Sequence, residues 1–354
     1  MCLARNVNFY DVTSKKAHTF ETGQKLTDVA ITQLRKSNVE SVYIDTLKSE
    51  VRMISTIDKE IRSEAISGIH NLADKFINSK SGVQKSDIEQ LGETTQKLIG
   101  SLSDKKDILV NIADIKMYDD YTFHHSLSVA IMAIAIGMEM GLDIQFVNEI
   151  GIAGLLHDIG KVSIPIEIIN KPSRLTEEEF NIVKMHPIYA ARHLQERNLV
   201  NFNVYSGIIQ HHEKYDGSGY PFHLTGDKIH LYARILAVAD VYDALTSNRP
   251  YRTPNPPNEA IEYIMAGNGS HFDENVVRAF IRKVAPYPTG SKVLLSNGEK
   301  ACVLKNFPDA PLRPMVSVLE TARCYDLAHD VSCYSIVVTG LSDDSLDGQQ
   351  LINM

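Results

Sequence analysis

Histidine is unevenly distributed along this chain of 354 residues. Nine of the 13 histidines lie between His124 and His230. Some stand next to a carboxylate or to one another, as in the run HDIGK, which begins at His157. One such pair arises by chance in most large proteins, but the concentration of imidazole in one segment indicates a special use. The candidate functional residues are His125, His157, Asp158, His186, His211, His212 and Asp240.

Asp240 is the most informative of these candidates, because it lies in the largely apolar stretch ILAVADVYDAL. An ionised carboxylate that is buried without a partner is very costly, and a bound metal ion would remove that cost. A buried salt bridge or a protonated Asp240 is the alternative. Each histidine taken singly is also compatible with a satisfied core histidine. The whole set, spread over successive predicted helices, favours a metal site.

The donor atoms of this set restrict its chemistry. Nitrogen and oxygen ligands without cysteine suit Fe, Mn, Zn or Ni. The ligands are too many for one tetrahedral zinc ion, so at least two metal ions are expected. Two neighbouring ions suit attack on phosphorus, because they activate a bridging hydroxide and neutralise the phosphate and leaving oxygens.

Consecutive helices between residues 118 and 285 are expected to position these side chains. The stretch from 126 to 141 is apolar nearly all round, which predicts a helix at the centre of a bundle. A second helix should end near His157. A third should begin at Thr176, where Glu179 completes a capping-box pattern, and Pro187 should kink or interrupt it.

The next predicted elements surround the remaining candidates. A helix through Ile208 to His212 is followed by a turn-rich loop, YDGSGYP, from Tyr215 to Pro221. An apolar helix from Tyr232 to Ser247 then contains Asp240.

The flanks of this helical segment differ in character. Residues 1–58 read as a small α/β module with a helix over 27–37 and a strand over 40–46. Residues 59–117 read as a helical linker. Residues 286–354 read as a β-rich extension with a loose tail, with strands expected over 292–295, 301–304, 315–319 and 335–338. The expected fold class is therefore mainly α, with a helical catalytic bundle over 118–285.

Composition excludes some functions. The formal net charge of −8 disfavours binding to long nucleic acid, which needs a broad basic face, but leaves room for a small anionic ligand. Four scattered cysteines favour free thiols in a reducing compartment. No signal peptide is visible, and the most apolar stretch, 127–142, contains Glu139 and is too short to span a bilayer. We expect a cytoplasmic protein without a membrane span.

The motifs together resemble a known family. His125, HDIGK, His186-Pro187, HHEKYDGSGYP and Asp240 occur in the order of the HD-GYP family, a branch of the HD phosphohydrolases. The segment NRPYR, residues 248–252, is also similar to the family pattern. The resemblance covers nearly half the chain. GQKLTDVAITQLRKSNVESVYIDT is similar to an accessory module that precedes such domains, and YPTGSKVLLSNGEKACVL to a C-terminal extension that follows them.

The resemblance implies roles for individual residues. The candidate His and Asp side chains would hold two divalent metal ions, Fe or Mn being favoured over Zn or Ni, with Asp158 as the bridging carboxylate. Lys161 would contact the scissile phosphate and, with Asp158, form the catalytic pair. The substrate would be contacted by Gly219, Tyr220, Pro221, Arg249 and Arg252.

Some of these roles have independent support or an alternative. Guanidinium groups match phosphate oxygens, although Arg249 and Arg252 could instead form surface salt bridges. Some family members hold a third ion through a Glu four residues before the first ligand; Tyr121 stands there in this chain, which makes a third ion less secure. Asp243 would orient a ligand or pair with Arg249. The histidines outside the expected ligand positions are His124, His193, His223 and His230.

The implied activity is hydrolysis of cyclic di-GMP, which would lower a second messenger of bacterial signalling; the sequence leaves open whether the reaction ends at pGpG or continues to GMP. Three alternatives stay open: the same chemistry on a mixed cyclic GMP-AMP dinucleotide, a non-catalytic receptor for such a dinucleotide, and a phosphohydrolase acting on nucleotides. The sequence does not distinguish a monomer from a homodimer. Diguanylate cyclases or other signalling proteins are candidate partners.

Overall fold

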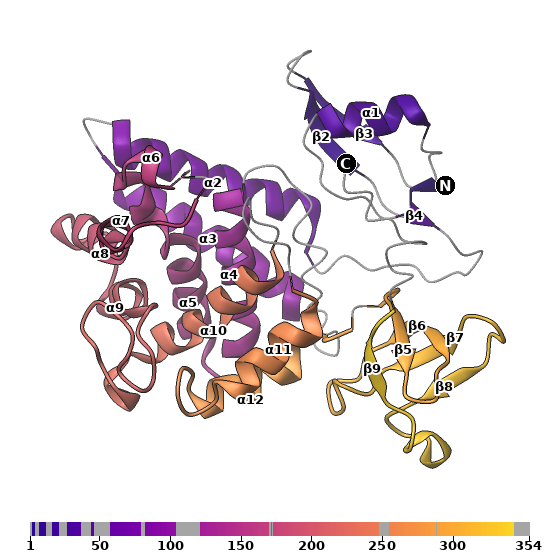
Figure 1. Cartoon of the computed structure of the whole chain (residues 1–354). Coiled ribbons are helices and arrows are strands. Elements are labelled where there is room, and N and C mark those ends of the chain that lie inside the picture. Colours follow the sequence, from indigo (N-terminus) through magenta and orange to yellow (C-terminus); the bar gives the residue numbers. More distant parts are fainter. Residues whose placement is uncertain are drawn as a thin grey trace. The chain divides into compact units, whose positions relative to one another are not determined.

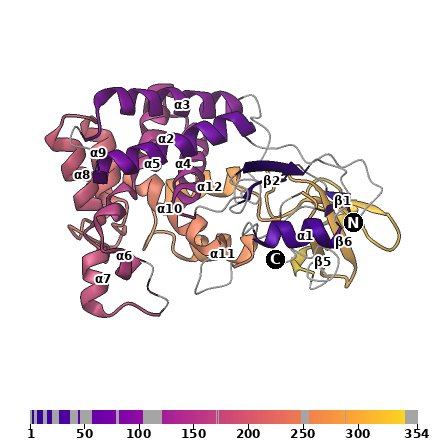
Figure 2. The same cartoon turned by 90° about the horizontal axis from the view of Figure 1, so that it is seen from above.

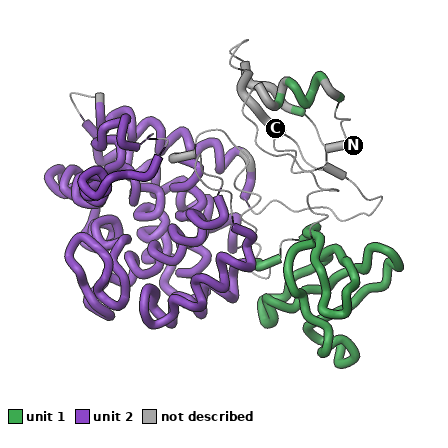
Figure 3. The backbone as a smooth tube through the Cα atoms, in the orientation of Figure 1, with its two compact units in different colours: residues 1–55, 111–121, 285–354 green, residues 56–110, 122–284 purple. Residues whose placement is uncertain are grey.

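The computed structural model describes residues 2–3, 7–11, 16–20, 27–36, 44–45, 57–78, 82–103, 121–169, 171, 173–247, 255–287 and 289–342 (Figure 1). The chain divides into two compact units (Figure 3). One comprises residues 56–110 and 122–284, and the other residues 1–55, 111–121 and 285–354. None of the helices in the described ranges combines the length and the apolar character needed to cross a membrane.

The larger unit is helical, as predicted. Its elements are α2 (Lys59–Asn78), α3 (Lys85–Ser103), α4 (Tyr121–Glu139), α5 (Ile144–Leu156), the 3-10 helix η2 (Ile159–Ser163), α6 (Ile166–Ile169), α7 (Glu177–Val183), α8 (His186–Glu196), α9 (Phe202–Gln210), the 3-10 helix η3 (Gly226–Lys228), α10 (Leu231–Thr246), α11 (Pro257–Ala266) and α12 (Glu274–Lys283).

The centre of this unit is formed by α4 and α10, two helices with largely apolar sequences. Residues 124–137 of α4 and most of α10 are buried, which confirms the central position expected from a helix that is apolar all round. Around them α3 packs on α5, and α9 packs on α5, α8 and α10. In both views α6 and α7 lie together at one edge of the unit (Figures 1 and 2).

The predicted helix boundaries around Thr176 and Pro187 are confirmed. The Thr176 hydroxyl accepts a hydrogen bond from the Glu179 main chain, while the Glu179 carboxylate accepts from the Thr176 main chain, so α7 begins with a capping box. Pro187 lies in the first turn of α8, where its missing N–H is tolerated. Pro187 therefore marks the boundary between two helices and does not kink a single helix.

Helices α2 and α3 belong to the same compact unit as the rest of the bundle. They pack on each other, and α2 also contacts η2. The predicted division at residues 58, 117 and 285 stays a prediction, but α2 and α3 are packed against the bundle.

The smaller unit begins with short elements of mixed type. Helix α1 (Asp28–Lys36) confirms the predicted helix. Strands β2 (Val7–Asp11) and β3 (Lys16–Phe20) form an antiparallel pair, and β1 (Cys2–Leu3) pairs with β4 (Ile44–Asp45). Of the strand predicted over 40–46, only β4 lies within the described residues.

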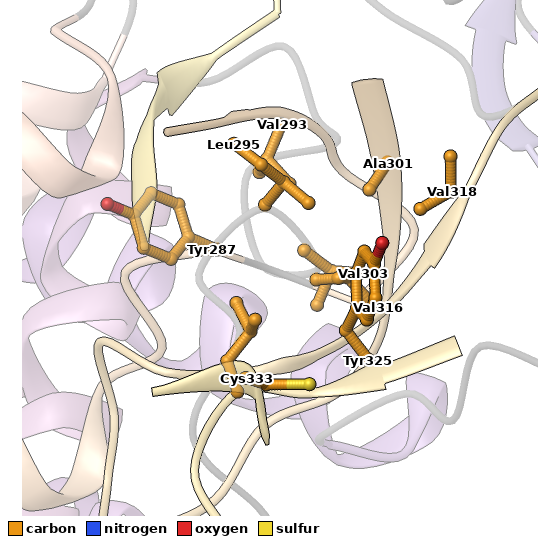
Figure 4. Close-up of a cluster of buried hydrophobic side chains, with 10 residues drawn as sticks. Tyr287, Val293, Leu295, Ala301, Val303, Val316, Val318, Tyr325 and Cys333 are labelled. Carbon is orange, nitrogen blue, oxygen red and sulfur yellow. The ribbon is translucent and has the colours of Figure 1, made fainter. Parts of the chain in front are cut away.

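The last part of the smaller unit is a five-stranded antiparallel sheet in the order β8-β7-β6-β5-β9. Its strands are β5 (Lys292–Leu295), β6 (Lys300–Lys305), β7 (Met315–Val318), β8 (Cys324–Asp326) and β9 (Val338–Leu341). Alternating side chains such as Val293, Leu295, Val316 and Val318 form its core (Figure 4).

The sheet departs from the sequence prediction at its two edges. The strand expected over 335–338 begins only at Val338, because the 3-10 helix η4 (Val331–Cys333), capped by Asp330, and a turn precede it. Strand β8 was not predicted, since three residues are too few to show an alternating pattern.

Candidate metal centre

Three of the candidate histidines share one hydrogen-bonding arrangement. The Nδ1 atoms of His157, His186 and His211 lie 2.8, 2.8 and 2.6 Å from the carbonyl oxygens of the residues three positions earlier. A carbonyl oxygen only accepts, so each Nδ1 must bear the proton. In the neutral ring each Nε2 is then left with a lone pair, which is the form in which imidazole binds metal.

These lone pairs face one another. The Nε2 atoms of His186 and His211 are 3.4 Å apart, and with both Nδ1 atoms protonated the neutral rings have no proton left to share between them. Asp158 adds an oxygen, because its Oδ1 lies 3.2 Å from Nε2 of His186 and is buried without a hydrogen-bond donor among the described residues. Several acceptors around one point are unfavourable unless a cation lies between them. The donor set thus fits a metal ion.

The potential ligands form two groups that share one residue. The first contains Asp158, His186, His211 and His212, and the second contains His125, His157 and Asp158. Within each group, one ligand atom per residue can be chosen so that all lie within 4.8 Å of one another. The shared Asp158 therefore stands between two potential ion positions.

Asp240 lies beside both groups but is not a member of either. Its Oδ1 is 3.1 Å from Nε2 of His125, and its Oδ2 is 3.8 Å from Nδ1 of His212. It is buried on α10, as the apolar sequence around it predicted.

His125 is oriented from its other side. Its Nδ1 lies 2.7 Å from Oδ2 of Asp243, one helical turn after Asp240, and the Ser247 hydroxyl donates to the same Oδ2 at 2.9 Å. A carboxylate behind a metal-binding imidazole fixes the ring and raises its basicity. Of the two roles predicted for Asp243, the structure shows the contact with a candidate ligand; pairing with Arg249 falls outside the described residues.

The surroundings keep three of these histidines uncharged. Burial lowers the pKa of His157, His211 and His212, in the last case to about 3, and neighbouring imidazoles lower the pKa of His211 further. All three rings are therefore neutral at neutral pH, with their lone pairs available.

The carboxylates are charged for the opposite reason. Burial by itself raises the pKa of Asp158, but Lys161 and nearby imidazoles outweigh it and hold this pKa well below its usual range. Burial also raises the pKa of Asp240, but the neighbouring His125 and His212 outweigh this effect and hold the pKa well below the usual range.

His125 differs from the other imidazoles. Burial opposes its protonation, but Asp158, Asp240 and Asp243 together raise its pKa well above the ordinary value. Metal binding at its Nε2 therefore requires the loss of a proton, which makes affinity dependent on pH.

The candidate ligands come together because most of them lie at helix ends. His157 follows the last residue of α5, Asp158 precedes η2, His186 begins α8, and His211 follows α9. Side chains at these ends leave the helices where the backbone turns. His125 and Asp240 lie inside α4 and α10.

Gly160 allows η2 to approach α8 closely enough for this arrangement. A Cβ atom on Gly160 would lie 2.0 Å from the carbonyl oxygen of His186 and 2.8 Å from the main-chain nitrogen of Ala190. Only glycine fits there, so its place in HDIGK has a packing reason.

Lys161 and Tyr220 lie at the borders of the cluster. The Lys161 Nζ is 2.5 Å from Oδ2 of Asp158. The Tyr220 ring stacks on His212, with centroids 4.7 Å apart and planes inclined by 29°. Burial, with Asp240 and Asp158, raises the pKa of Tyr220, so its hydroxyl stays protonated.

Of the remaining predicted residues, the structure describes only those in the loop around Tyr220. Gly219 and Pro221 flank Tyr220 in the loop, and the Tyr220–Pro221 peptide bond is cis. Arg249, Arg252 and the side chain of Tyr121 lie outside the described residues. The four histidines not expected as ligands, His124, His193, His223 and His230, belong to neither ligand group.

Two residues at the site were missed by the sequence reasoning. Glu213, directly after the His pair, is buried and accepts hydrogen bonds from the main chain of the following loop. Lys184 places its Nζ 4.7 Å from the centroid of the Phe180 ring and 5.9 Å from that of Tyr220. Glu213 could have been found from the sequence, because it is the third residue of the motif HHEKYDGSGYP and directly follows two candidate ligands.

Comparison with known proteins agrees with this geometry. The HD domain family matches residues 94–276, about half of the chain, and the chain belongs to this family. A cyclic di-GMP phosphodiesterase from Pseudomonas aeruginosa is 37% identical over 277 residues, which cover 78% of this chain and 65% of that protein. This similarity confirms the resemblance to the HD-GYP branch.

Two further similarities concern substrate and fold. A 3'3'-cGAMP-specific phosphodiesterase from Vibrio cholerae is 38% identical over 182 residues, 51% of this chain and 41% of that protein. The chain thus spans less than two thirds of either relative. An HDG"Y"P protein from Bdellovibrio bacteriovorus has the same fold, with a TM-score of 0.51 at 16% identity, covering 79% of this chain and 94% of that one.

Proposed function

We propose that the chain is a metal-dependent phosphodiesterase that hydrolyses cyclic di-GMP, with either pGpG or GMP as the end product. The observation that supports this most directly is that two groups of potential ligands share Asp158. A carboxylate between two ion positions is the arrangement that a two-metal phosphodiester hydrolase requires. The name of the Pseudomonas aeruginosa relative supports the choice of substrate.

The proposed ligands are His125, His157, Asp158, His186, His211, His212 and Asp240, with Asp158 bridging. The proposed cofactor is a pair of divalent ions, Fe or Mn in preference to Zn or Ni. When bound, such ions lower the pKa of a coordinated water and neutralise charge on the phosphate. A third ion would need a ligand near Tyr121 and is not part of the proposal.

The chain's own residues would bind and orient the substrate. Lys161, whose Nζ contacts Asp158, would hold a positive charge beside the scissile phosphate. Tyr220, with Gly219 and Pro221, would line the guanine and phosphate pocket. Arg249 and Arg252 would bind the phosphates through paired guanidinium donors. Lys184, close to Tyr220, adds a second described cation at this border.

The test is metal analysis combined with a hydrolysis assay on the wild-type protein and on Asp158→Asn. The substitution keeps the size of the side chain and removes the charge, so both ions should be lost, and turnover of cyclic di-GMP should fall at least about 100-fold. Assays under anaerobic and aerobic conditions are needed, because iron sites lose activity on oxidation. Retained turnover in Asp158→Asn would refute the proposed centre.

A mixed cyclic GMP-AMP dinucleotide is a second candidate substrate, which the Vibrio cholerae relative favours. The two substrates differ in one base, and pocket shape decides between them. Hydrolysis rates of both, measured on one preparation at one metal concentration, distinguish them. Binding without cleavage in the metal-loaded protein would instead identify a receptor.

The proposed organisation follows from the sequence: an accessory module over 1–58, a helical linker over 59–117, a catalytic domain over 118–285 and an extension over 286–354. A cytoplasmic location, a homodimer and signalling proteins such as diguanylate cyclases as partners belong to the same proposal. Size measurement in solution tests the homodimer.

A further inference from the structure

Glu213 is a buried acidic residue that belongs to neither group of potential metal ligands. Its side chain is 3% exposed, and no lysine or arginine among the described residues forms an ion pair with it. Instead, its Oε1 accepts a hydrogen bond from the main-chain N–H of Phe222 at 2.6 Å, and its Oε2 accepts from Leu224 at 3.0 Å. Both oxygens are thus used to hold the main chain of the loop that follows.

That loop, residues 214–225, folds back on the His pair that precedes it. The main-chain N–H of Tyr220 donates to the His212 carbonyl oxygen at 3.1 Å, and the Tyr220 ring lies on the His212 ring. Gly219 makes the approach possible, since a Cβ there would lie 2.3 Å from the Lys214 main-chain nitrogen. The position of Tyr220 therefore depends on how tightly the loop is held.

Glu213 fixes the second half of the loop, just beyond Tyr220. Between its two hydrogen-bonded partners lies His223, whose φ of 57° is in the left-handed region that residues other than glycine seldom adopt. The two bonds from Phe222 and Leu224 to one carboxylate stabilise this turn. Hydrogen bonds to a charged acceptor are stronger than neutral ones, so the clamp depends on the charge of Glu213.

We propose that Glu213 is a positioning residue: by holding the 214–225 loop through its main chain, it keeps Tyr220 stacked on His212 and so forms one wall of the cyclic dinucleotide site. This inference rests on the proposed function. Glu213 acts on substrate through Tyr220 and does not touch the reacting atoms.

The primary variant is Glu213→Gln, which preserves size but replaces one acceptor oxygen with an NH2 donor, so that one of the two main-chain bonds is lost. Glu149→Gln is the matched control. Glu149 is also buried, and it lies on α5, outside the loop. Its carboxylate accepts hydrogen bonds from the neutral side chains of Gln145, Asn201, Asn203 and Tyr232.

For Glu213→Gln we expect a rise in KM for cyclic di-GMP of about tenfold, because Tyr220 would no longer be held in place to stack on a base of the substrate. Metal content should be unchanged and kcat should stay within about threefold of wild type, because the metal ligands are intact. Glu149→Gln should leave KM unchanged. A wild-type KM in Glu213→Gln, or an equal rise in both variants, would overturn the proposal.

A double-mutant cycle tests whether Glu213 acts through Tyr220. The KM of Glu213→Gln/Tyr220→Ala should equal that of Tyr220→Ala alone, because the wall is already absent. Effects that multiply would show that Glu213 acts by another route and would overturn the proposal. Glu213→Asp, which keeps the charge but has a shorter reach, serves as a second variant should Glu213→Gln not fold.

Hydrogen exchange separates this inference from the proposed function. Amides within 214–225 should exchange faster in Glu213→Gln than in wild type or Glu149→Gln, whether or not a substrate is known. Unchanged exchange would overturn the positioning role even in an active enzyme. If the wild-type protein cleaves no cyclic dinucleotide while Glu213→Gln still exchanges faster than wild type, the proposed function is refuted and the role of Glu213 in the loop stays supported.

Discussion

At the scale of single residues, the position of each imidazole proton decides what the centre is able to bind. His157, His186 and His211 each donate Nδ1–H to a main-chain carbonyl, and this fixes the free lone pair on Nε2. Main-chain carbonyls are held by the helices themselves. The correct tautomer is therefore guaranteed by secondary structure and needs no further side chain at these three positions.

His125 lies inside a helix and depends on a side chain, Asp243, for its orientation. Asp243→Asn should lower metal affinity by about 10–100-fold, because the charge behind the imidazole is lost while every proposed ligand is kept. Titration of metal-free protein with Mn(II) measures this effect, and excess metal should restore turnover. Glu149→Gln is the control, and an unchanged affinity in Asp243→Asn would show that the contact does not orient His125.

At the scale of elements, the centre depends on how closely η2 approaches α8. Gly160→Ala should destabilise the protein by about 1–3 kcal/mol, because the new Cβ would overlap the His186 carbonyl oxygen and push the two elements apart. The same displacement should separate Asp158 from His186 and reduce metal content. Denaturant unfolding and metal analysis measure both effects.

Gly100→Ala provides the comparison, since a Cβ on this residue of α3 would meet nothing within 4 Å. Alanine is favoured over glycine inside a helix, so this variant should be more stable than wild type by about 0.5–1 kcal/mol, with full metal content. A Gly160→Ala protein as stable and as metal-rich as Gly100→Ala would mean that η2 and α8 are not tightly coupled.

At the scale of the whole molecule, the proposed ligands connect α4, α5, α8, α9 and α10, so bound metal should stabilise the helical unit as a whole. At a free metal concentration about 1,000 times Kd, this linkage amounts to about 4 kcal/mol. Calorimetry should show a lower Tm for the helical unit when a chelator has removed the metal than when the metal is bound. The transition of the C-terminal sheet, which has a core of its own, should not move.

Without metal, stability should decrease as the pH falls from about 6.5 towards 4. The pKa of His212 is lowered to about 3 and that of His124 to about 4, both chiefly by burial, and His157 and His211 are lowered as well. In this window the unfolded chain takes up protons that the folded chain does not, which favours unfolding.

His125 does not offset this effect. Its pKa is raised in the folded protein, so below about 6.5 it is protonated in both states. Denaturant unfolding of metal-free protein at about pH 6 and about pH 4.5, both inside this window, gives the measurement. Equal stability at the two values would contradict the burial of neutral histidines at this centre.

The sequence by itself determined the local features of this protein. The capping box at Thr176, the interruption at Pro187 and the apolar helices over 126–141 and 232–247 were predicted because their signals lie within a few residues of one another. The family was recognised for the same reason, since each motif is a short run of letters.

Only the tertiary structure decided which of these residues meet. His125 and Asp243, which are in contact, are 118 residues apart in the sequence. Glu213 holds the loop that contains Tyr220 through the main-chain N–H groups of Phe222 and Leu224, and these bonds do not depend on which side chains those two residues carry. No local pattern encodes such contacts. They arise when helices pack at close distance, so the sharing of Asp158 between two groups of ligands became visible only in the folded chain.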